Sequence, residues 1–436
     1  MKRIIFALAA FLSAASLSYS QENPSPKEIS PSSIGLEAAS PDVVALLKED
    51  PDRAGVNVHV YEFGKISDTK PPRGYKPFYI SHYGRHGTRA AGDYEFIYVL
   101  TRLEKCDSLG ILTEEGKALL SETKAVFEAY DGREGRLTPR GEREHRMLAE
   151  RMYSRFPGVF RKGSKNVRVF SSTVPRCLVS MASFVSSLSA IRPDLNYHIV
   201  SDSKQQPLLT NDCSKQNRIE ASRMIVPINR AEVDTLRLPA LIFTDEEKGK
   251  ETIGPIARFQ RRICSCAVLA KNFDLDCDLF RFIPFETVYN YYDSHNRHIY
   301  LTQCNSAEFG DERMPRVKPL VDEIVRQADE AIESGRVAAD LRFGHDWPYM
   351  AIVCYLGLEG AGDRMGVDEV PAKWFGPEYI CLGCNLQMIF YRNRGGSVLV
   401  KFLVNEKETL LRGLEPVSGP YYDWALVREN IEGWRR

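Results

Sequence analysis

The stretch His82–Ala90, HYGRHGTRA, directly follows the apolar run Phe78–Ile80 and gathers two arginines and His86 around glycines. A short apolar run that ends in a polar turn is typical of a buried strand. A solvated loop would account for the charges. So would an anion site around a reactive imidazole, because guanidinium groups bind phosphate oxygens bidentately. Taken alone, the stretch leaves both interpretations open.

The same pattern occurs three times along the chain. The first apolar run is Pro77–Ser81. The second, Val167–Phe170, leads through SSTVPR into a helical pattern at Cys177–Leu188. The third, Leu341–Phe343, leads through GHDWP into a helical pattern at Tyr349–Leu356. Strands that alternate with helices favour an α/β fold with a parallel sheet.

The expected helix starts place charged residues at strand ends. Ser172 or Thr173 could cap the helix after the second run, and Pro175 suits its first turn. Arg176 then lies in that first turn. Asp346 is a candidate for capping the helix after the third run.

Three such junctions can meet at one site, because ligands of a parallel sheet bind beyond the carboxyl ends of its strands, where helix N-termini favour anions. There a neutral imidazole can attack phosphorus, and a protonated carboxyl can give its proton to the leaving alkoxide. Arginines can neutralise the transferred charge, so this chemistry needs no metal or other cofactor. The predicted site residues are Arg85, His86, Arg89, Arg176, His345 and Asp346.

These residues carry a resemblance to a known family. RHGTR at 85–89 resembles the RHGxR signature of the histidine phosphatase superfamily, and His345–Asp346 resembles the HD pair of its acid phosphatase branch. Supporting matches are LTPRGEREH, VRVFSSTVPRCLVSMASF, LRFGHDWPYMAIVCYLGL and VLVKFLVNEKETL. NDCSKQNR and LAKNFDLDCDLF resemble segments of multiple inositol polyphosphate phosphatases and phytases.

The resemblance implies a role for each site residue. His86 would be the nucleophile of a phosphomonoester hydrolase that forms a phosphohistidine intermediate, and Asp346 would be its proton donor. The residues that would bind the phosphoryl group are Arg85, Arg89, Arg176 and His345. The implied substrates are inositol polyphosphates or similar organic phosphates.

Two departures from the family pattern leave alternatives open. Ala90–Ala91 stands where relatives often have a proline after RHGxR, and His345–Asp346–Trp347 stands where inositol polyphosphate phosphatases commonly have HAE. A broad-specificity acid or sugar phosphatase is one alternative. A catalytically inactive protein that binds a phosphorylated ligand is another, although such a protein needs neither His86 nor Asp346.

The composition limits the possible partners. The 436 residues include 58 basic and 58 acidic ones, so no overall field attracts nucleic acid or an anionic membrane. A small phosphomonoester is the expected partner, and the sequence leaves the oligomeric state open. Ten cysteines include the close pairs Cys264 with Cys266 and Cys381 with Cys384. The pairs lie far apart without nearby histidine pairs, which favours disulfides or buried thiols over a zinc site.

The first residues predict export. Lys2–Arg3, the apolar Ile4–Leu17 and the small residues up to Ser20 have the layout of a secretory signal peptide over residues 1–20. The protein would then be periplasmic or extracellular and not held in a membrane. Residues 21–42, rich in Pro and Ser, predict a linker or an N-terminal arm.

The remaining chain predicts an α/β fold: a parallel-rich central sheet flanked by helices, with an inserted, mostly helical cap domain. The end of the chain, SVLVKFLVNEKETL, predicts two strands joined by a turn at Asn405–Glu406. The α/β catalytic domain is expected to comprise residues 43–93, 160–207 and 332–436, and the helical cap insertions residues 94–159 and 208–331.

Overall fold

The apolar run before HYGRHGTRA forms part of a central strand in the computed structural model, which describes residues 29–91 and 95–433. Within those residues the strands are β1 (Lys76–Arg85), β2 (Asn166–Ser171), β3 (Asn196–Val200), β4 (Ala339–Gly344), β5 (Asn385–Arg392), β6 (Val398–Val404), β7 (Lys407–Thr409) and β8 (Tyr422–Asp423). The strand order is β3-β2-β4-β1-β5-β6-β7, and β8 pairs with β6. The pairs from β3 to β1 are parallel and those from β1 to β8 antiparallel. Helices flank this sheet, which confirms the predicted α/β class.

The first predicted strand is longer in the structure than its apolar run. It was expected at Pro77–Ser81 but continues to Arg85. The extension forms because β1 is paired on both sides, so that His82 lies opposite Leu341 of β4 and Gln387 of β5. Two ladders of backbone hydrogen bonds outweigh the polar character of these residues. The predicted hairpin at the chain's end is confirmed, with its turn at Asn405–Glu406 between β6 and β7.

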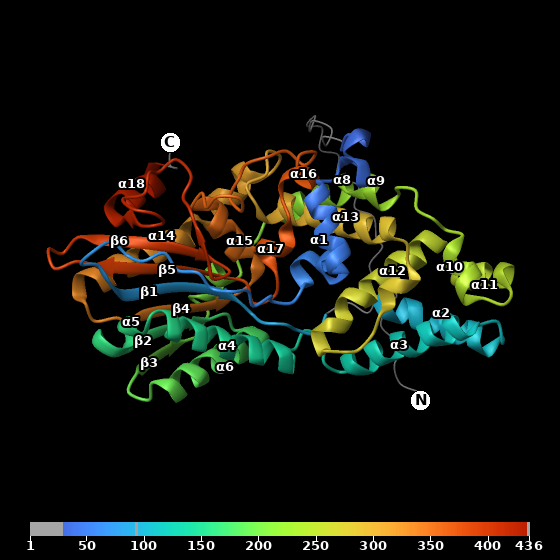
Figure 1. The fold of residues 1–436 in the computed structure, drawn as a ribbon, viewed down its shortest axis with the longest axis horizontal. Helices are drawn as coiled ribbons and strands as arrows, with labels where there is room; N and C mark the ends of the chain where they lie inside the picture. The colour runs from blue at the N-terminus through green and yellow to red at the C-terminus, as the bar shows by residue number, and fades with distance from the viewer. Residues whose placement is uncertain (1–28, 92–94, 434–436) are drawn as a thin grey trace.

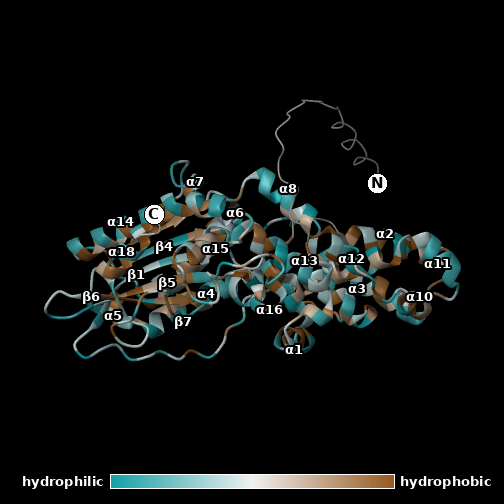
Figure 2. Ribbon diagram, turned by 90° about the horizontal axis from the view of Figure 1, so that it is seen from above, coloured by the Kyte–Doolittle hydropathy of each residue, from teal (hydrophilic) through white to brown (hydrophobic). Residues whose placement is uncertain are grey.

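Helices α4 and α5 cover one face of the sheet, and α14 and α18 cover the other (Figure 2). The strands β5 and β6 are largely apolar, whereas α8 and α11 at the surface are largely polar (Figure 2). The helices packed around the sheet are α4 (Pro139–Arg155), α5 (Pro157–Lys162), α6 (Pro175–Ile191), α7 (Gln206–Leu209), α14 (Gly310–Ser334), α15 (Asp346–Tyr355), α16 (Val370–Lys373), α17 (Gly376–Ile380) and α18 (Trp424–Gly433).

A largely helical region extends beyond one end of the sheet (Figure 1). Its helices are α1 (Pro41–Glu49), α2 (Glu95–Ser108), α3 (Glu114–Tyr130), α8 (Lys215–Met224), α9 (Val226–Asn229), α10 (Arg237–Ile242), α11 (Glu246–Ile253), α12 (Ile256–Ala270) and α13 (Phe285–Gln303). Short 3₁₀ helices are η1 (Pro31–Ser33), η2 (Leu36–Ala38), η3 (Pro51–Val58), η4 (Lys271–Phe273) and η5 (Leu279–Phe282). Most of this region comes from between β1 and β4 in sequence.

Both helix starts at the predicted site differ from expectation by one or two residues. The N-cap of α6 is Val174, which has no side-chain cap, and the hydroxyl of Ser172 accepts from Val174 N at 3.3 Å and lies 3.2 Å from His345 Nε2. The N-cap of α15 is His345, and Asp346 is the first residue of that helix. The prediction that Arg176 lies in the first turn of α6 is confirmed.

Some expectations concern the N-terminus and the cysteines. The predicted signal peptide and residues 21–28 of the predicted arm lie outside the described residues. All ten cysteines are free thiols, nine of them buried, so the thiol alternative holds in the structure. Within the described part of the chain, no helix is long and apolar enough to cross a membrane.

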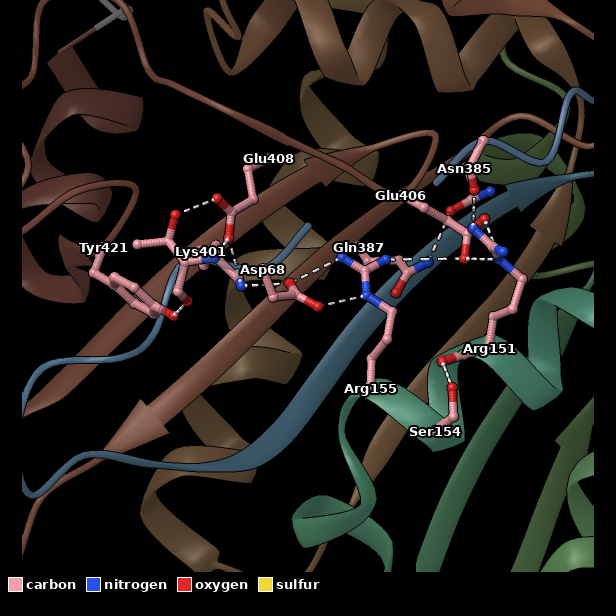
Figure 3. Close-up of polar contacts among 12 residues, drawn as sticks. Asp68, Arg151, Ser154, Arg155, Asn385, Gln387, Lys401, Glu406, Glu408 and Tyr421 are labelled. Atoms are coloured by element: carbon pink, nitrogen blue, oxygen red, sulfur yellow. Dashed lines mark hydrogen bonds and ion pairs between the residues drawn. The ribbon is translucent and has the colours of Figure 1, made fainter. Parts of the chain in front are cut away.

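Hydrogen bonds and ion pairs among charged side chains connect the irregular segment 60–72 to the sheet (Figure 3). Lys401 of β6 is 1% exposed, and its Nζ lies 2.8 Å from both Asp68 Oδ1 and Glu408 Oε1. Arg155 of α4 donates to the other oxygen of Asp68 at 2.9 Å. Burial works to raise the pKa of Asp68, but hydrogen bonds from Arg155 and Lys401 outweigh it and lower that pKa.

Replacing Lys401 by Met is expected to destabilise the fold by about 3 kcal/mol at pH 7, because two carboxylates lose their buried partner. The lowered pKa of Asp68 contributes stability above the unfolded carboxyl pKa of about 3.9, and this contribution is lost as pH falls through the folded value. The difference in free energy of unfolding between the wild type and Lys401→Met should therefore become smaller below about pH 4. Urea unfolding at several pH values measures it.

Lys407→Met is the matched control, because Lys407 lies on the same hairpin but is 64% exposed and pairs with the exposed Glu378. It should change the free energy of unfolding by less than about 1 kcal/mol. Equal unfolding midpoints for wild type and Lys401→Met at pH 7 would contradict the role given to the ion pairs of Lys401.

Candidate active site

The register of the sheet brings the three predicted junctions together. Arg85 at the end of β1 lies opposite Gly344 of β4, and Ser171 at the end of β2 lies opposite Phe343. The residues that follow these strand ends therefore start from one edge of the sheet. The rings of His86 and His345 lie 5.6 Å apart, centroid to centroid.

His86 is held in one orientation by backbone hydrogen bonds. Its N–H donates to Gly344 O at 3.0 Å, and its carbonyl oxygen accepts from Gly383 N at 3.0 Å. The ring is 1% exposed, and its Nδ1 lies 3.0 Å from Gly87 O. A carbonyl oxygen can only accept, so Nδ1 carries the hydrogen and Nε2 keeps its lone pair. Burial and the neighbouring arginines hold the pKa of His86 well below its usual value, so the ring is neutral.

The three predicted arginines surround this ring with positive charge. Arg85 forms an ion pair with Asp346 at 3.0 Å, but no carboxylate among the described residues pairs with Arg89 or Arg176. Burial, reinforced by Arg85, lowers the pKa of Arg89 to about 10 and also lowers that of Arg176. The buried Nε atoms of all three have no acceptor in the described structure. Each of the three guanidinium groups therefore keeps an N–H donor that the described residues do not use.

His345 lies between α6 and its own helix. Its Nε2 is 3.2 Å from Ser172 Oγ, and its Nδ1 is 3.4 Å from Arg176 Nη2. Trp347 stacks on its ring at 5.0 Å. Burial and then Arg176 lower the pKa of His345 to about 4. Because Arg176 only donates, Nδ1 accepts and Nε2–H points to Ser172.

Asp346 is the carboxylate of the site and is 3% exposed. Its Oδ2 is 3.0 Å from Arg85 Nη2 and accepts from Asn57 Nδ2 at 2.9 Å. Burial works to raise its pKa, but Arg85 and the hydrogen bond from Asn57 outweigh it and lower that pKa. The carboxyl is thus ionised while nothing offsets the charge of the arginines.

Asn57 is a site residue that the sequence did not predict. It lies at the end of η3, and its carbonyl oxygen also accepts from Arg85 Nη1. The preceding Val56 is buried with φ 48°, a conformation that costs a β-branched residue about 1–3 kcal/mol. An asparagine in an irregular segment has no periodicity or motif that marks it, so no sequence signal could have identified it.

The charges of the site residues disfavour the binding of a metal ion. Near the site residues three guanidinium groups face one carboxylate, a set that repels a cation. Among the described residues, one group could supply metal ligands: Asp50, His59 and Glu62, whose ligand atoms lie within 4.8 Å of one another. Arg53 already binds Glu62, and Lys271 already binds Asp50.

Known proteins share a family model and a fold with this chain. Residues 84–234 match the model of the histidine phosphatase superfamily, branch 2. No curated protein sequence matches the chain. Among solved structures, the multiple inositol polyphosphate phosphatase of Bifidobacterium longum in complex with phosphate is similar, with a TM-score of 0.71 and 17% identity over 88% of this chain and 98% of that one.

Two further structures share the fold. The same Bifidobacterium enzyme in complex with inositol hexasulfate has a TM-score of 0.64 and 18% identity over 87% of this chain and 97% of that one. The phytase from D. castellii has a TM-score of 0.67 and 14% identity over 88% of this chain and 86% of that one. The chain thus shares the fold of these two enzymes over most of its length, and its residues 84–234 match the family model of the histidine phosphatase superfamily, branch 2.

Proposed function

We propose that this protein hydrolyses phosphomonoesters through a phosphohistidine intermediate. The observation that carries the proposal is the state of His86, a buried neutral imidazole whose Nδ1–H is fixed on Gly87 O. Its Nε2 lone pair is free to attack. Three guanidinium groups with unsatisfied Nε–H donors surround it, as an incoming phosphoryl dianion requires.

The proposed reaction has two steps. In the first, His86 Nε2 forms a bond to phosphorus, the bond from phosphorus to the ester oxygen breaks, and the carboxyl of Asp346 protonates the leaving alkoxide. In the second, a water attacks phosphorus, Asp346 accepts its proton, and the N–P bond breaks to release phosphate. Gly87 O accepts from Nδ1–H throughout, which favours the positive charge that the ring carries while phosphorylated.

The proton on Asp346 comes with substrate binding in this proposal. Arg85 and Asn57 favour the carboxylate form of Asp346. A bound phosphate dianion offsets the charge of Arg85, Arg89 and Arg176. The pKa of Asp346 then rises, because the cations that favoured its ionised form are paired with the substrate.

For the substrate we propose inositol polyphosphates or similar organic phosphates. The support is the fold shared with an inositol polyphosphate phosphatase and a phytase over most of the chain. A broad acid or sugar phosphatase is the second candidate, favoured by the aspartate at position 346 and by Ala90–Ala91. We also propose export to the periplasm or the cell exterior, on the basis of the signal-peptide pattern in residues 1–20.

His86→Ala is expected to lower turnover of inositol hexakisphosphate by about 10⁴-fold or more, because the nucleophile is lost. The purified protein is assayed for phosphate release from inositol hexakisphosphate, an aryl phosphate and a sugar phosphate. His298→Ala is the control: this half-buried ring on α13 bonds to Ser222 of α8 and should leave turnover unchanged.

The substrate panel separates the candidates. A preference for inositol hexakisphosphate supports the proposed substrate, whereas equal or faster turnover of aryl and sugar phosphates would favour the broad phosphatase. Phosphate release by His86→Ala at the wild-type rate would exclude the covalent mechanism. Phosphate binding without turnover by the wild type would make the protein a binder.

Asp346→Asn is expected to slow hydrolysis of an alkyl phosphate by about 10²–10⁴-fold but to slow that of p-nitrophenyl phosphate much less in its first step, because a good leaving group needs no proton. For the wild type, kcat on the alkyl phosphate should fall above neutral pH as the donor loses its proton. A burst experiment with both substrates isolates the first step. A wild-type rate that still rises through about pH 8, or equal losses on both substrates, would argue against Asp346 as the donor.

A further inference from the structure

The loop that carries His86 rests on the first turn of α4, which supplies none of the reacting groups. Thr138, the N-cap of α4, donates both its N–H, at 2.9 Å, and its hydroxyl, at 3.1 Å, to Thr88 O. The two backbones are in direct contact. A Cβ on Gly87 would lie 2.6 Å from Gly141 O, and one on Gly141 would lie 2.2 Å from Thr88 O. The position of the loop is therefore set by α4.

Glu144, one turn further along α4, binds this loop with both carboxylate oxygens. Its Oε2 accepts from the N–H of Thr88 at 2.8 Å, and its Oε1 accepts from the Thr88 hydroxyl at 2.7 Å. Glu144 is 3% exposed and Thr88 is fully buried. The catalytic scheme above uses neither residue.

The bond to the Thr88 N–H has a consequence for His86. That N–H and the carbonyl of Gly87 belong to the same planar peptide unit, so they point in opposite directions. Glu144 holds the N–H side of the unit, and His86 Nδ1–H donates to its C=O side at 3.0 Å. A rotation of this peptide would turn the carbonyl away and remove the acceptor that keeps hydrogen on Nδ1.

We propose that Glu144 is a positioning residue that fixes the tautomer of His86 by holding the Gly87–Thr88 peptide. The proposal rests on the proposed function of His86 as nucleophile. Without the bond from Glu144, the ring can place its hydrogen on Nε2, where it blocks attack on phosphorus. The loss then appears in the rate of the chemical step. The arginines that are proposed to bind phosphate keep their positions, because Glu144 contacts none of them.

The arrangement does not depend on the charge of Glu144. The groups that face it are Arg140, whose Nε is 3.4 Å from Oε1, Thr88 of the loop, and the Cys381 thiol from the segment before β5. Burial outweighs the bonds from Thr88 and Arg140 and raises the pKa of Glu144 to about 7. A protonated carboxyl still accepts from the Thr88 N–H and can donate to the Thr88 hydroxyl, so the peptide stays fixed at acid pH.

The test compares Glu144→Gln with Glu144→Leu. A glutamine amide can accept from the N–H and donate to the hydroxyl, so Glu144→Gln should keep kcat within about 5-fold of wild type, with an unchanged pH profile. Glu144→Leu should lower kcat by about 100-fold, while KM and the inhibition constant of inorganic phosphate stay within about 3-fold.

Glu150→Leu is the matched control, because Glu150 lies on the same helix and bonds to Ser187 of α6. Because Glu150 is exposed, its replacement should change the unfolding midpoint little and leave kcat unchanged. ¹⁵N spectra of histidine-labelled protein show which ring nitrogen of His86 carries the hydrogen, and His86→Ala assigns the signal. The wild type and Glu144→Gln can be measured in this way even if Glu144→Leu does not fold. The wild type and Glu144→Gln should show hydrogen on Nδ1 of His86.

Hydrogen on Nε2 of His86 in the wild type would overturn the proposal, and so would a wild-type kcat in Glu144→Leu. A Glu144→Gln variant as impaired as Glu144→Leu, or a similar loss of kcat in Glu150→Leu, would overturn it as well. Inactive His86→Ala with fully active Glu144→Leu refutes this proposal alone. Active His86→Ala refutes the proposed function instead.

Discussion

The excess of positive charge at the ends of β1, β2 and β4 is the constraint on which the site depends. Arg85, Arg89 and Arg176 are brought together by the sheet, and Asp346 is the carboxylate that pairs with one of them. Such charge costs free energy to bury. Together with burial it keeps His86 neutral, and it outweighs the effect of burial on Asp346, which stays ionised. In the proposed reaction a bound phosphoryl group offsets this charge, so that substrate binding also raises the pKa of Asp346 and prepares it to donate a proton.

The fold holds these repelling groups in place through backbone hydrogen bonds. Arg85 N donates to Cys384 O at 2.9 Å, and the next residue, His86, bonds to Gly344 on one side and Gly383 on the other. The loop is thus tied to both neighbouring strands as well as to α4. These backbone contacts fix the donors of the site before an anion would bind, which lowers the entropy that binding would cost.

Local sequence patterns predicted the six site residues, because the expected chemistry requires particular residue types at the ends of the strands. The strand–turn–helix junctions around His86, Arg176 and His345 were evident because apolar runs, prolines and charged residues lie within a few positions of one another. The α/β class and the turn at Asn405–Glu406 followed from the same periodicity and are confirmed, and the sheet is mixed with mostly parallel central strands. The roles of the six site residues stay predictions.

Contacts between distant segments could not be predicted in this way. Whether β1 ends at Ser81 or Arg85 depends on partners in β4 and β5, which are more than 250 residues away. Asn57 reaches Asp346 from an irregular segment, and Glu144 looks like an ordinary charge on an amphipathic helix until its contact with Thr88 is seen. Each of these groups acts through a hydrogen bond that only the tertiary fold creates.

The central claim is that His86 carries the phosphoryl group between two steps. The most direct measurement is a rapid acid-free quench of the wild-type enzyme during turnover of a ³²P-labelled substrate, followed by peptide mapping. The account predicts one acid-labile, base-stable phosphoryl group on Nε2 of His86, formed and lost at rates that match turnover. Phosphate release without any labelled histidine, or label on another residue, would contradict it.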